Sequence, residues 1–187
     1  MVAPTDLRLS QTENRIYAAA AQSLAAAADL ARAAGCDVHL LGDALEGEAR
    51  VVAQVQAAHA LAIRSRLQPG DAPVLLLSGG ELTVTRRGSG IGGPNAEFCL
   101  ALALGLQGAE GIHALACDTD GVDGAAEVAG AVIGPGTLAA AATAGLDPQD
   151  YLARNDAHSF FESVNGQVIT GPTLTNVNDF RAILIAG

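Results

Sequence analysis

The sequence predicts an α/β fold in which a layered parallel or mixed sheet carries helices on both faces, in a Rossmann-like arrangement. Short apolar segments typical of strands alternate with longer segments of helical periodicity, which is the pattern of βαβ units. Only 3% of the residues are aromatic and tryptophan is absent, so aliphatic side chains must fill the core, as they do where helices cover a parallel sheet. A length of 187 residues and a hydrophobic content of 50% suit a single domain, residues 1–187.

The first part of the chain is expected to form two helices and two strands. An alanine-rich amphipathic helix is predicted over about 12–34, where Gly35 ends it. A short strand at 38–41 and a second helix at 47–67 follow. The turn at Pro69-Gly70-Asp71 then leads into a fully apolar run at 74–77, which is typical of a strand covered on both faces.

The second part begins with a break of that strand at Ser78-Gly79-Gly80. Alternating residues from Leu82 to Val84 predict a further, half-buried strand. A helix is expected over about 95–106, with Pro94 at its first position. The remaining expectations are a strand at 112–117, several short helices within 136–163, and strands at 167–170 and 182–185.

Charge and composition exclude several classes of function. The formal net charge is −10, and all ten basic residues are arginine. Nucleic acids and anionic membranes are therefore poor candidate partners, because both attract basic surfaces. A phosphate-binding loop that ends in lysine is also excluded. No apolar run is long enough to span a membrane and no signal peptide is evident, so we expect a cytoplasmic protein.

Cysteine and histidine give no metal-binding pattern. The three cysteines are widely spaced in apolar surroundings, which favours structural thiols in a reducing compartment. The four histidines do not have the spacing of metal ligands, and His113 is expected to be a core histidine within a strand.

The glycine-rich segment before Pro94 predicts an anion site at a helix N-terminus, since glycines let a backbone approach a phosphate closely. The cofactor-binding candidates in this segment are Gly88, Gly90, Gly92 and Gly93. Three of these glycines match G-x-G-x-x-G, and Asp118 ends the next strand, so a dinucleotide such as NAD(P)H is one interpretation. The alternating strand before the segment, Arg86 and Arg87 at the turn, and the missing amide of Pro94 weigh against it. A purely structural glycine turn is the other interpretation.

Three aspartates cluster within six positions after the predicted strand at 112–117. Carboxylates provide the oxygen ligands that Mg²⁺ prefers. The candidate metal ligands are therefore Asp118, Asp120 and Asp123. They could instead accept hydrogen bonds from amides of their own loop as Asx-turns. The loop at 170–179 is dense in hydroxyls and amides, which suits hydrogen bonding to a polyol or a phosphate.

The motifs SGGE, DTDGVDG and TGPTLTNVND each follow a predicted strand. Ligands of open α/β sheets bind at the carboxyl ends of the strands, so we expect the three motifs to meet at one edge of the sheet.

Their order is also informative. SGGELTVTRRGSGIGGPNAEF, then ALACDTDGVDGAAEVAGAVI, then DAHSFFESVNGQVITGPTLTNVNDFRAILI resembles the MOFRL domain, the carboxyl-terminal part of class II glycerate kinases. The resemblance covers about residues 73–187. Bacterial members of this family often carry the name hydroxypyruvate reductase.

This resemblance implies a two-domain kinase that phosphorylates the 2-hydroxyl of D-glycerate with ATP and Mg²⁺ in a cleft between its domains. The preceding N-terminal kinase domain is expected to be absent from this chain, so the isolated chain should be inactive. The alternatives are an NAD(P)H-dependent hydroxypyruvate reductase and a non-catalytic binding domain. The partners that the resemblance implies for this chain are a small hydroxy acid as substrate and the missing N-terminal domain. The resemblance does not decide whether the protein forms a homo-oligomer.

The resemblance also assigns residues to the cleft. The catalytic candidates are Glu81, Asp120 and Asn95. Besides the four glycines before Pro94, the cofactor-binding candidates are Ser78, Gly79, Gly80, Thr173, Thr175, Asn176 and Asn178.

Overall fold

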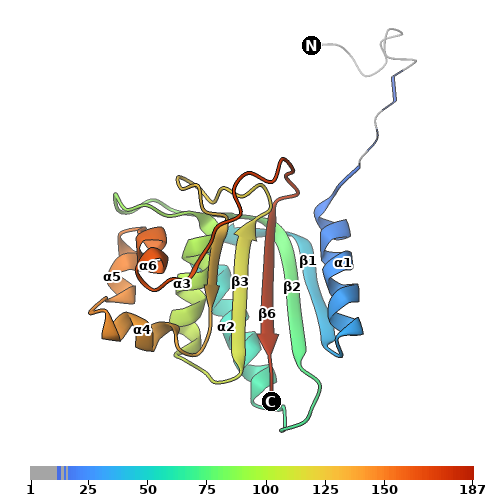
Figure 1. The fold of residues 1–187 in the computed structure, drawn as a ribbon, viewed down its shortest axis with the longest axis horizontal. Coiled ribbons are helices and arrows are strands. Elements are labelled where there is room, and N and C mark those ends of the chain that lie inside the picture. The colour runs from blue at the N-terminus through green and yellow to red at the C-terminus, as the bar shows by residue number, and fades with distance from the viewer. Residues whose placement is uncertain (1–11, 14, 16) are drawn as a thin grey trace.

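The computed structural model describes residues 12, 13, 15 and 17–187, and its centre is a six-stranded sheet in the order β1-β2-β6-β3-β4-β5 (Figure 1). The strands are β1 (Asp37–Glu48), β2 (Val74–Thr83), β3 (Ile112–Asp118), β4 (Gly130–Ile133), β5 (Gln167–Val168) and β6 (Asp179–Ile185). β1 pairs in parallel with β2, whereas β6 is antiparallel to both of its neighbours, β2 and β3. The carboxyl ends of β1, β2 and β3 therefore lie at one edge, beside the start of β6.

Helices cover both faces of this mixed sheet, which confirms the predicted α/β class. They are α1 (Ala20–Ala33), α2 (Ala49–Arg64), α3 (Pro94–Leu106), α4 (Thr137–Thr143), α5 (Pro148–Ala153) and α6 (Ala157–Ser163). Leu24 and Ala28 of α1 pack on Leu77 from one side, while α2 and α3 pack on the other side, where Leu76 lies. Successive side chains of β2 point to opposite faces of the sheet, so this strand contributes apolar side chains to both. The three short helices α4 to α6 lie beside α3, on the side of the sheet away from β1 and α1 (Figure 1).

Helix α3 lies at the centre of the core. Every residue from Asn95 to Ala103 is buried, as expected for a helix that is apolar on all sides. Small residues let α2 approach it closely, and a Cβ atom added at Gly105 would lie 2.8 Å from the Cβ atom of Ala57.

Several element boundaries differ from the sequence-based expectations. Helix α1 begins at Ala20 rather than at residue 12, and the amide of Ala19 donates to the side chain of Gln22 at this N-terminus. Asn14 and Ile16, which the predicted helix includes, lie outside the described residues. The two strands predicted around Ser78-Gly79-Gly80 are one strand, because Gly79 and Gly80 pair with Phe180 and Asp179 across the ladder.

Two other expectations need correction. Strand β4 was not predicted, since its four residues, Gly130–Ile133, offer too short a pattern. His113 is not a core histidine, because it is exposed on the sheet face that α1 leaves open, at the start of β3.

Among the described helices, none combines the length and the apolar character needed to cross a membrane.

The parallel pair β1–β2 depends on a glycine. Gly80 has a φ of +102°, and a Cβ atom there would lie 2.2 Å from the backbone nitrogen of Leu45 in β1. Gly70 has a similar φ of +95° with nothing within 4 Å of such an atom. Gly80→Ala should therefore lower the unfolding free energy by about 1–3 kcal/mol more than Gly70→Ala, as measured by urea denaturation. Equal losses in the two variants would show that only backbone strain matters at Gly80.

Candidate active site

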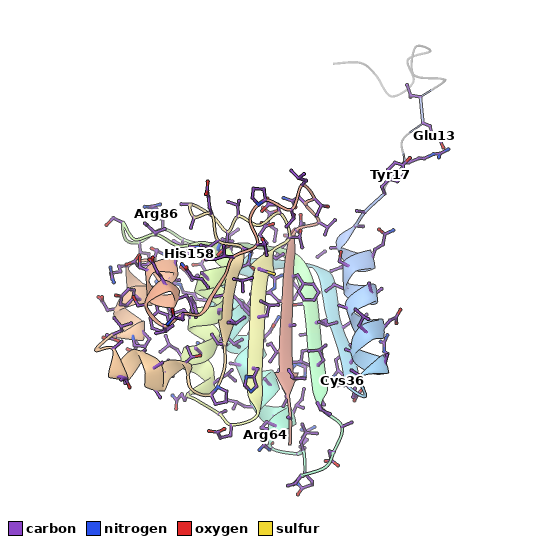
Figure 2. The ribbon with its side chains drawn as sticks, viewed as in Figure 1. Glu13, Tyr17, Cys36, Arg64, Arg86 and His158 are labelled. Carbon is purple, nitrogen blue, oxygen red and sulfur yellow. The ribbon has the colours of Figure 1, made fainter. Side chains whose placement is uncertain are left out.

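The three polar motifs meet at the carboxyl edge of the sheet, which confirms the predicted convergence. Gly80 at the end of β2 and Asp118 at the end of β3 both pair with Asp179, the first residue of β6. The loop before β6 is joined to the loop after β3, since the Asn176 side-chain amide donates to a carboxylate oxygen of Asp120 at 3.1 Å. Arg86 and His158 lie at this end of the molecule, whereas Cys36 and Arg64 lie at the opposite end (Figure 2).

Hydrogen bonds hold the two loops together along their length. The Thr119 hydroxyl donates to the carbonyl oxygen of Asn178 at 2.8 Å, and the amide of Thr173 donates to the carbonyl oxygen of Asp120 at 3.0 Å. A Cβ atom at Gly121 would lie 2.2 Å from the carbonyl oxygen of Gly171, so only glycine allows this approach. Thr173, Thr175, Asn176 and Asn178, four of the cofactor-binding candidates, remain exposed on the outer surface of this edge.

Asp118 and Asp120 are half-buried neighbours at the edge. Asp118 accepts a hydrogen bond from the amide of Asp120, and Asp120 accepts one from the amide of Val122, so both form the Asx-turns considered above. Burial raises the pKa of Asp118 to about 6, and the negative charges of Asp120 and Asp179 raise it as well.

Asp123 does not join the other two aspartates. It is buried beneath the edge, where its two carboxylate oxygens accept hydrogen bonds from the backbone amides of Asn95 and Ala96 at 3.0 and 2.8 Å. No cluster of three or more histidine, cysteine, aspartate or glutamate side chains within the described part of the chain could hold a metal ion. The predicted metal set is thus reduced to Asp118 and Asp120.

The same contacts correct the predicted anion site at the start of α3. The first amides of a helix attract an anion because they lack partners within the helix. In α3 these amides are already paired with the carboxylate of Asp123. The structure therefore offers a phosphate no free helix N-terminus after the glycine-rich segment, and the dinucleotide interpretation loses its main physical support.

The glycines of this segment serve close packing. Gly88, Gly90 and Gly92 lie against the turn at 154–156, and a Cβ atom at Gly88 would be 2.3 Å from the carbonyl oxygen of Arg154. Gly93 lies against Asp123 in the same way, at 2.4 Å. The side chain of Asn155 fixes the segment, because its oxygen accepts hydrogen bonds from the amides of Arg87 and Gly88.

Asn95 was predicted to be catalytic, but its side chain is fully buried and cannot reach a substrate. Its side-chain amide donates to Asp179 at 2.7 Å and to Asp123 at 3.3 Å. Ser78 is also buried, so its hydroxyl is not available at the surface. Of the catalytic candidates, only Glu81 is exposed at the edge, and Asp120 is half-buried.

A buried arginine extends the hydrogen bonds that join Asn95, Asp123 and Asp179. Arg181, which is 1% exposed, donates to Asp179 at 2.8 Å and to the carbonyl oxygen of Gly79 at 2.6 Å. The pKa of Arg181 is lowered by burial, although the charge of Asp179 opposes this. Sequence reasoning missed Arg181, but a signal was present, because it shares the inward face of β6 with Ile183 and Ile185.

His158 is the second buried cation candidate. Its Nε2 atom lies 2.9 Å from the carbonyl oxygen and 3.2 Å from the carboxylate of Asp123. Burial lowers the pKa of His158, but the hydrogen bond and the charge of Asp123 together outweigh it, so the pKa is raised above its ordinary value of 6.5.

Comparisons with known proteins fit this arrangement. The fold is that of an α/β domain found in glycerate kinase of Thermotoga maritima, whose crystal structure superposes with a TM-score of 0.88 at 33% identity, over 93% of this chain and 42% of that one. A solved structure of a Pyrococcus horikoshii protein superposes with a TM-score of 0.87 at 31% identity, over 94% of this chain and 40% of that one.

The chain belongs to the MOFRL family, which it matches over residues 74–179. An Agrobacterium vitis protein with the provisional name hydroxypyruvate reductase is 50% identical over 91% of this chain and 45% of its own length. D-glycerate 2-kinase of Thermotoga maritima is 35% identical over 85% of this chain and 38% of its own length. The chain therefore spans less than half the length of these relatives.

The packing role of the glycine-rich segment predicts a loss of stability on substitution. A Cβ atom at Gly90 would lie 2.4 Å from the Cβ atom of Asp156, whereas one at Gly136 would meet nothing within 4 Å. Gly90→Ala should lower the unfolding free energy by about 1–3 kcal/mol, and Gly136→Ala should change it by less than about 0.5 kcal/mol. Similar urea midpoints for the two variants would contradict the packing role.

The raised pKa of His158 predicts that stability depends on pH. Because the folded protein binds this proton more tightly than the unfolded chain, the contribution is fully present below the unfolded pKa of 6.5 and is lost as the pH rises through the folded pKa. The difference in unfolding free energy between the wild-type protein and His158→Gln should be larger at about pH 6 than at about pH 9. A difference that does not change with pH would contradict the assignment.

Proposed function

We propose that this chain forms one wall of the active site of a glycerate 2-kinase, which transfers the terminal phosphoryl group of ATP to the 2-hydroxyl of D-glycerate. The observation that carries the proposal is the agreement with Thermotoga maritima glycerate kinase over 93% of this chain. The relatives named glycerate kinase also include that of Homo sapiens, which is 42% identical over 62% of this chain.

The edge of the sheet suits this chemistry. Phosphoryl transfer needs positioning and electrostatic stabilisation rather than covalent catalysis by the protein. Mg²⁺ is commonly held by one or two carboxylates together with substrate phosphates, and the neighbouring Asp118 and Asp120 fit that requirement. The bound metal would neutralise charge on the phosphates. Glu81 and the exposed loop at 173–178 supply further oxygen and amide groups to orient the hydroxy acid.

The chain lacks one necessary component, which is cationic charge. ATP and glycerate are both anions, yet the chain contains no lysine; near the candidate edge the described residues include the exposed Arg86, labelled in Figure 2, and its neighbour Arg87. We therefore propose that a preceding N-terminal domain supplies further cationic groups and the other wall of the cleft. In this view residues 1–187 form one domain, and the chain alone turns over no glycerate.

The reductase alternative has less physical support. It rests on the name of the Agrobacterium vitis relatives, whereas the glycine-rich segment has no free helix N-terminus for a pyrophosphate. We also propose that the enzyme acts in the cytoplasm, where its three widely spaced cysteines would stay reduced.

Activity assays can separate the two functions. The longer protein that contains this chain should consume ATP with D-glycerate in the presence of Mg²⁺, and should not oxidise NADH with hydroxypyruvate. NADH oxidation without glycerate-dependent ATP consumption would refute the proposal.

A matched pair of variants tests the role of Asp120. Asp147 caps α5 through a hydrogen bond from the amide two residues later, as Asp120 does in its own loop, but it lies outside the candidate site. In the longer protein, Asp120→Asn should lower kcat by about 100-fold, because the side chain keeps its shape but loses its charge. Asp147→Asn should leave kcat unchanged, and both should shift Tm slightly. Similar kcat values for the two variants would assign Asp120 to loop structure alone.

A further inference from the structure

Helix α2 presents apolar side chains on two opposite faces. The inward face packs in the core through Ala49, Ala53, Ala57 and Ala60. The outward stripe, repeating at helical spacing, consists of Val51, Val55, Ala58 and Ala62. Val51 and Val55 are 58% and 67% exposed, although a solvent-facing helix surface normally carries polar residues. The stripe is therefore typical of a helix that is covered on both sides.

The stripe continues into a groove against the edge strand of the sheet. Leu41 and Leu45 of β1 line this groove together with Val51, Val52 and Val55, and its volume is about 360 Å³. We call it the α2–β1 groove. β1 is the long edge strand of the sheet.

The α2–β1 groove is adjacent to the candidate active site. Leu45 pairs with Gly80, the residue at which β2 reaches the carboxyl edge, and α2 begins at this same edge. A second apolar hollow lies on the face of the sheet that carries α1, and its lining includes His113, Val132 and Leu184. These residues lie toward the end of the sheet where β3 begins, away from the carboxyl edge. A domain that completes the active site would need to contact the groove rather than this distant hollow.

Charge argues against a second copy of this chain as the occupant. Asp43 and Glu46 are exposed in β1, close in sequence to the groove-lining Leu45, and the chain carries a net charge of −10. In a two-fold dimer the same patch faces itself, so the acidic residues of β1 and the negative charge of both copies would be brought close together. An apolar surface bordered by lysine or arginine is the complementary partner. More than half the length of the relatives lies outside the part they share with this chain, which provides a candidate for that surface.

We propose that the α2–β1 groove is the docking surface for the additional domain of the full-length protein, which contacts it through an apolar helix or sheet face rimmed by basic residues. The position of the groove rests on the proposed two-walled active site. The contact itself does not depend on which reaction that site carries out.

Photo-crosslinking in the longer protein tests the proposal without any substrate. A benzoylphenylalanine residue introduced in place of Val55 should cross-link to a peptide of the same polypeptide outside these 187 residues. The control is the same residue in place of Val132, which is 42% exposed on the distant hollow, and it should give no such cross-link. A cross-link from position 55 to a second copy, no cross-link from it, or a cross-link from position 132 alone would each overturn the proposal. A gene that encodes only these 187 residues would overturn it as well.

A pair of charge variants gives a second readout. Val55→Glu places a better helix former at an exposed position, so α2 should still fold, but it introduces a charge into the proposed contact. In the longer protein it should accelerate proteolysis between the two domains by roughly tenfold, and Val132→Glu should not. Equal rates for the two variants would contradict docking at the groove. A protein that passes these tests but does not phosphorylate glycerate would refute the proposed function and leave the docking surface standing.

Discussion

The carboxylate of Asp123 at the N-terminus of α3 is the contact on which the candidate site depends. It pairs with the first amides of the central helix, and it also lies against His158 of α6. Asn95 connects Asp123 to Asp179, which Arg181 neutralises while holding the carbonyl group of Gly79. One buried polar network therefore ties the ends of β2, β3 and β6 to the core. Such a network stabilises one geometry because each buried charge needs its partner.

Close backbone packing is the second constraint on this edge. The glycine-rich segment fits against the turn at 154–156, and Gly121 fits against Gly171. Both contacts leave no room for a Cβ atom, so the segment is shaped from within the protein rather than by a ligand. What remains accessible is the rim above it, where the exposed residues include Glu81 and the hydroxyl and amide side chains of the loop at 173–178. An acidic rim without lysine is suited to share a site with a cationic partner surface and a metal.

The sequence by itself determined the fold class, the presence of most helices and strands, and the convergence of the three polar motifs. These follow from local rules, since periodicity sets which face of a strand or helix is buried, and parallel strands place their carboxyl ends together. It also determined the family, because three motifs in a fixed order are far more specific than any one of them.

Only the tertiary structure decided which of the polar residues are accessible. Asn95, Asp123 and the four glycines before Pro94 have the residue types of a binding site, yet the structure uses them for capping and packing. Arg181, a charged residue, lies in the core, because folding brings the carbonyl group of Gly79, 102 positions away in the sequence, to it beside its close neighbour Asp179. The alternation along β6 indicates an inward position for Arg181, but local sequence cannot reveal the partners, and the free energy of burying a polar group depends on them.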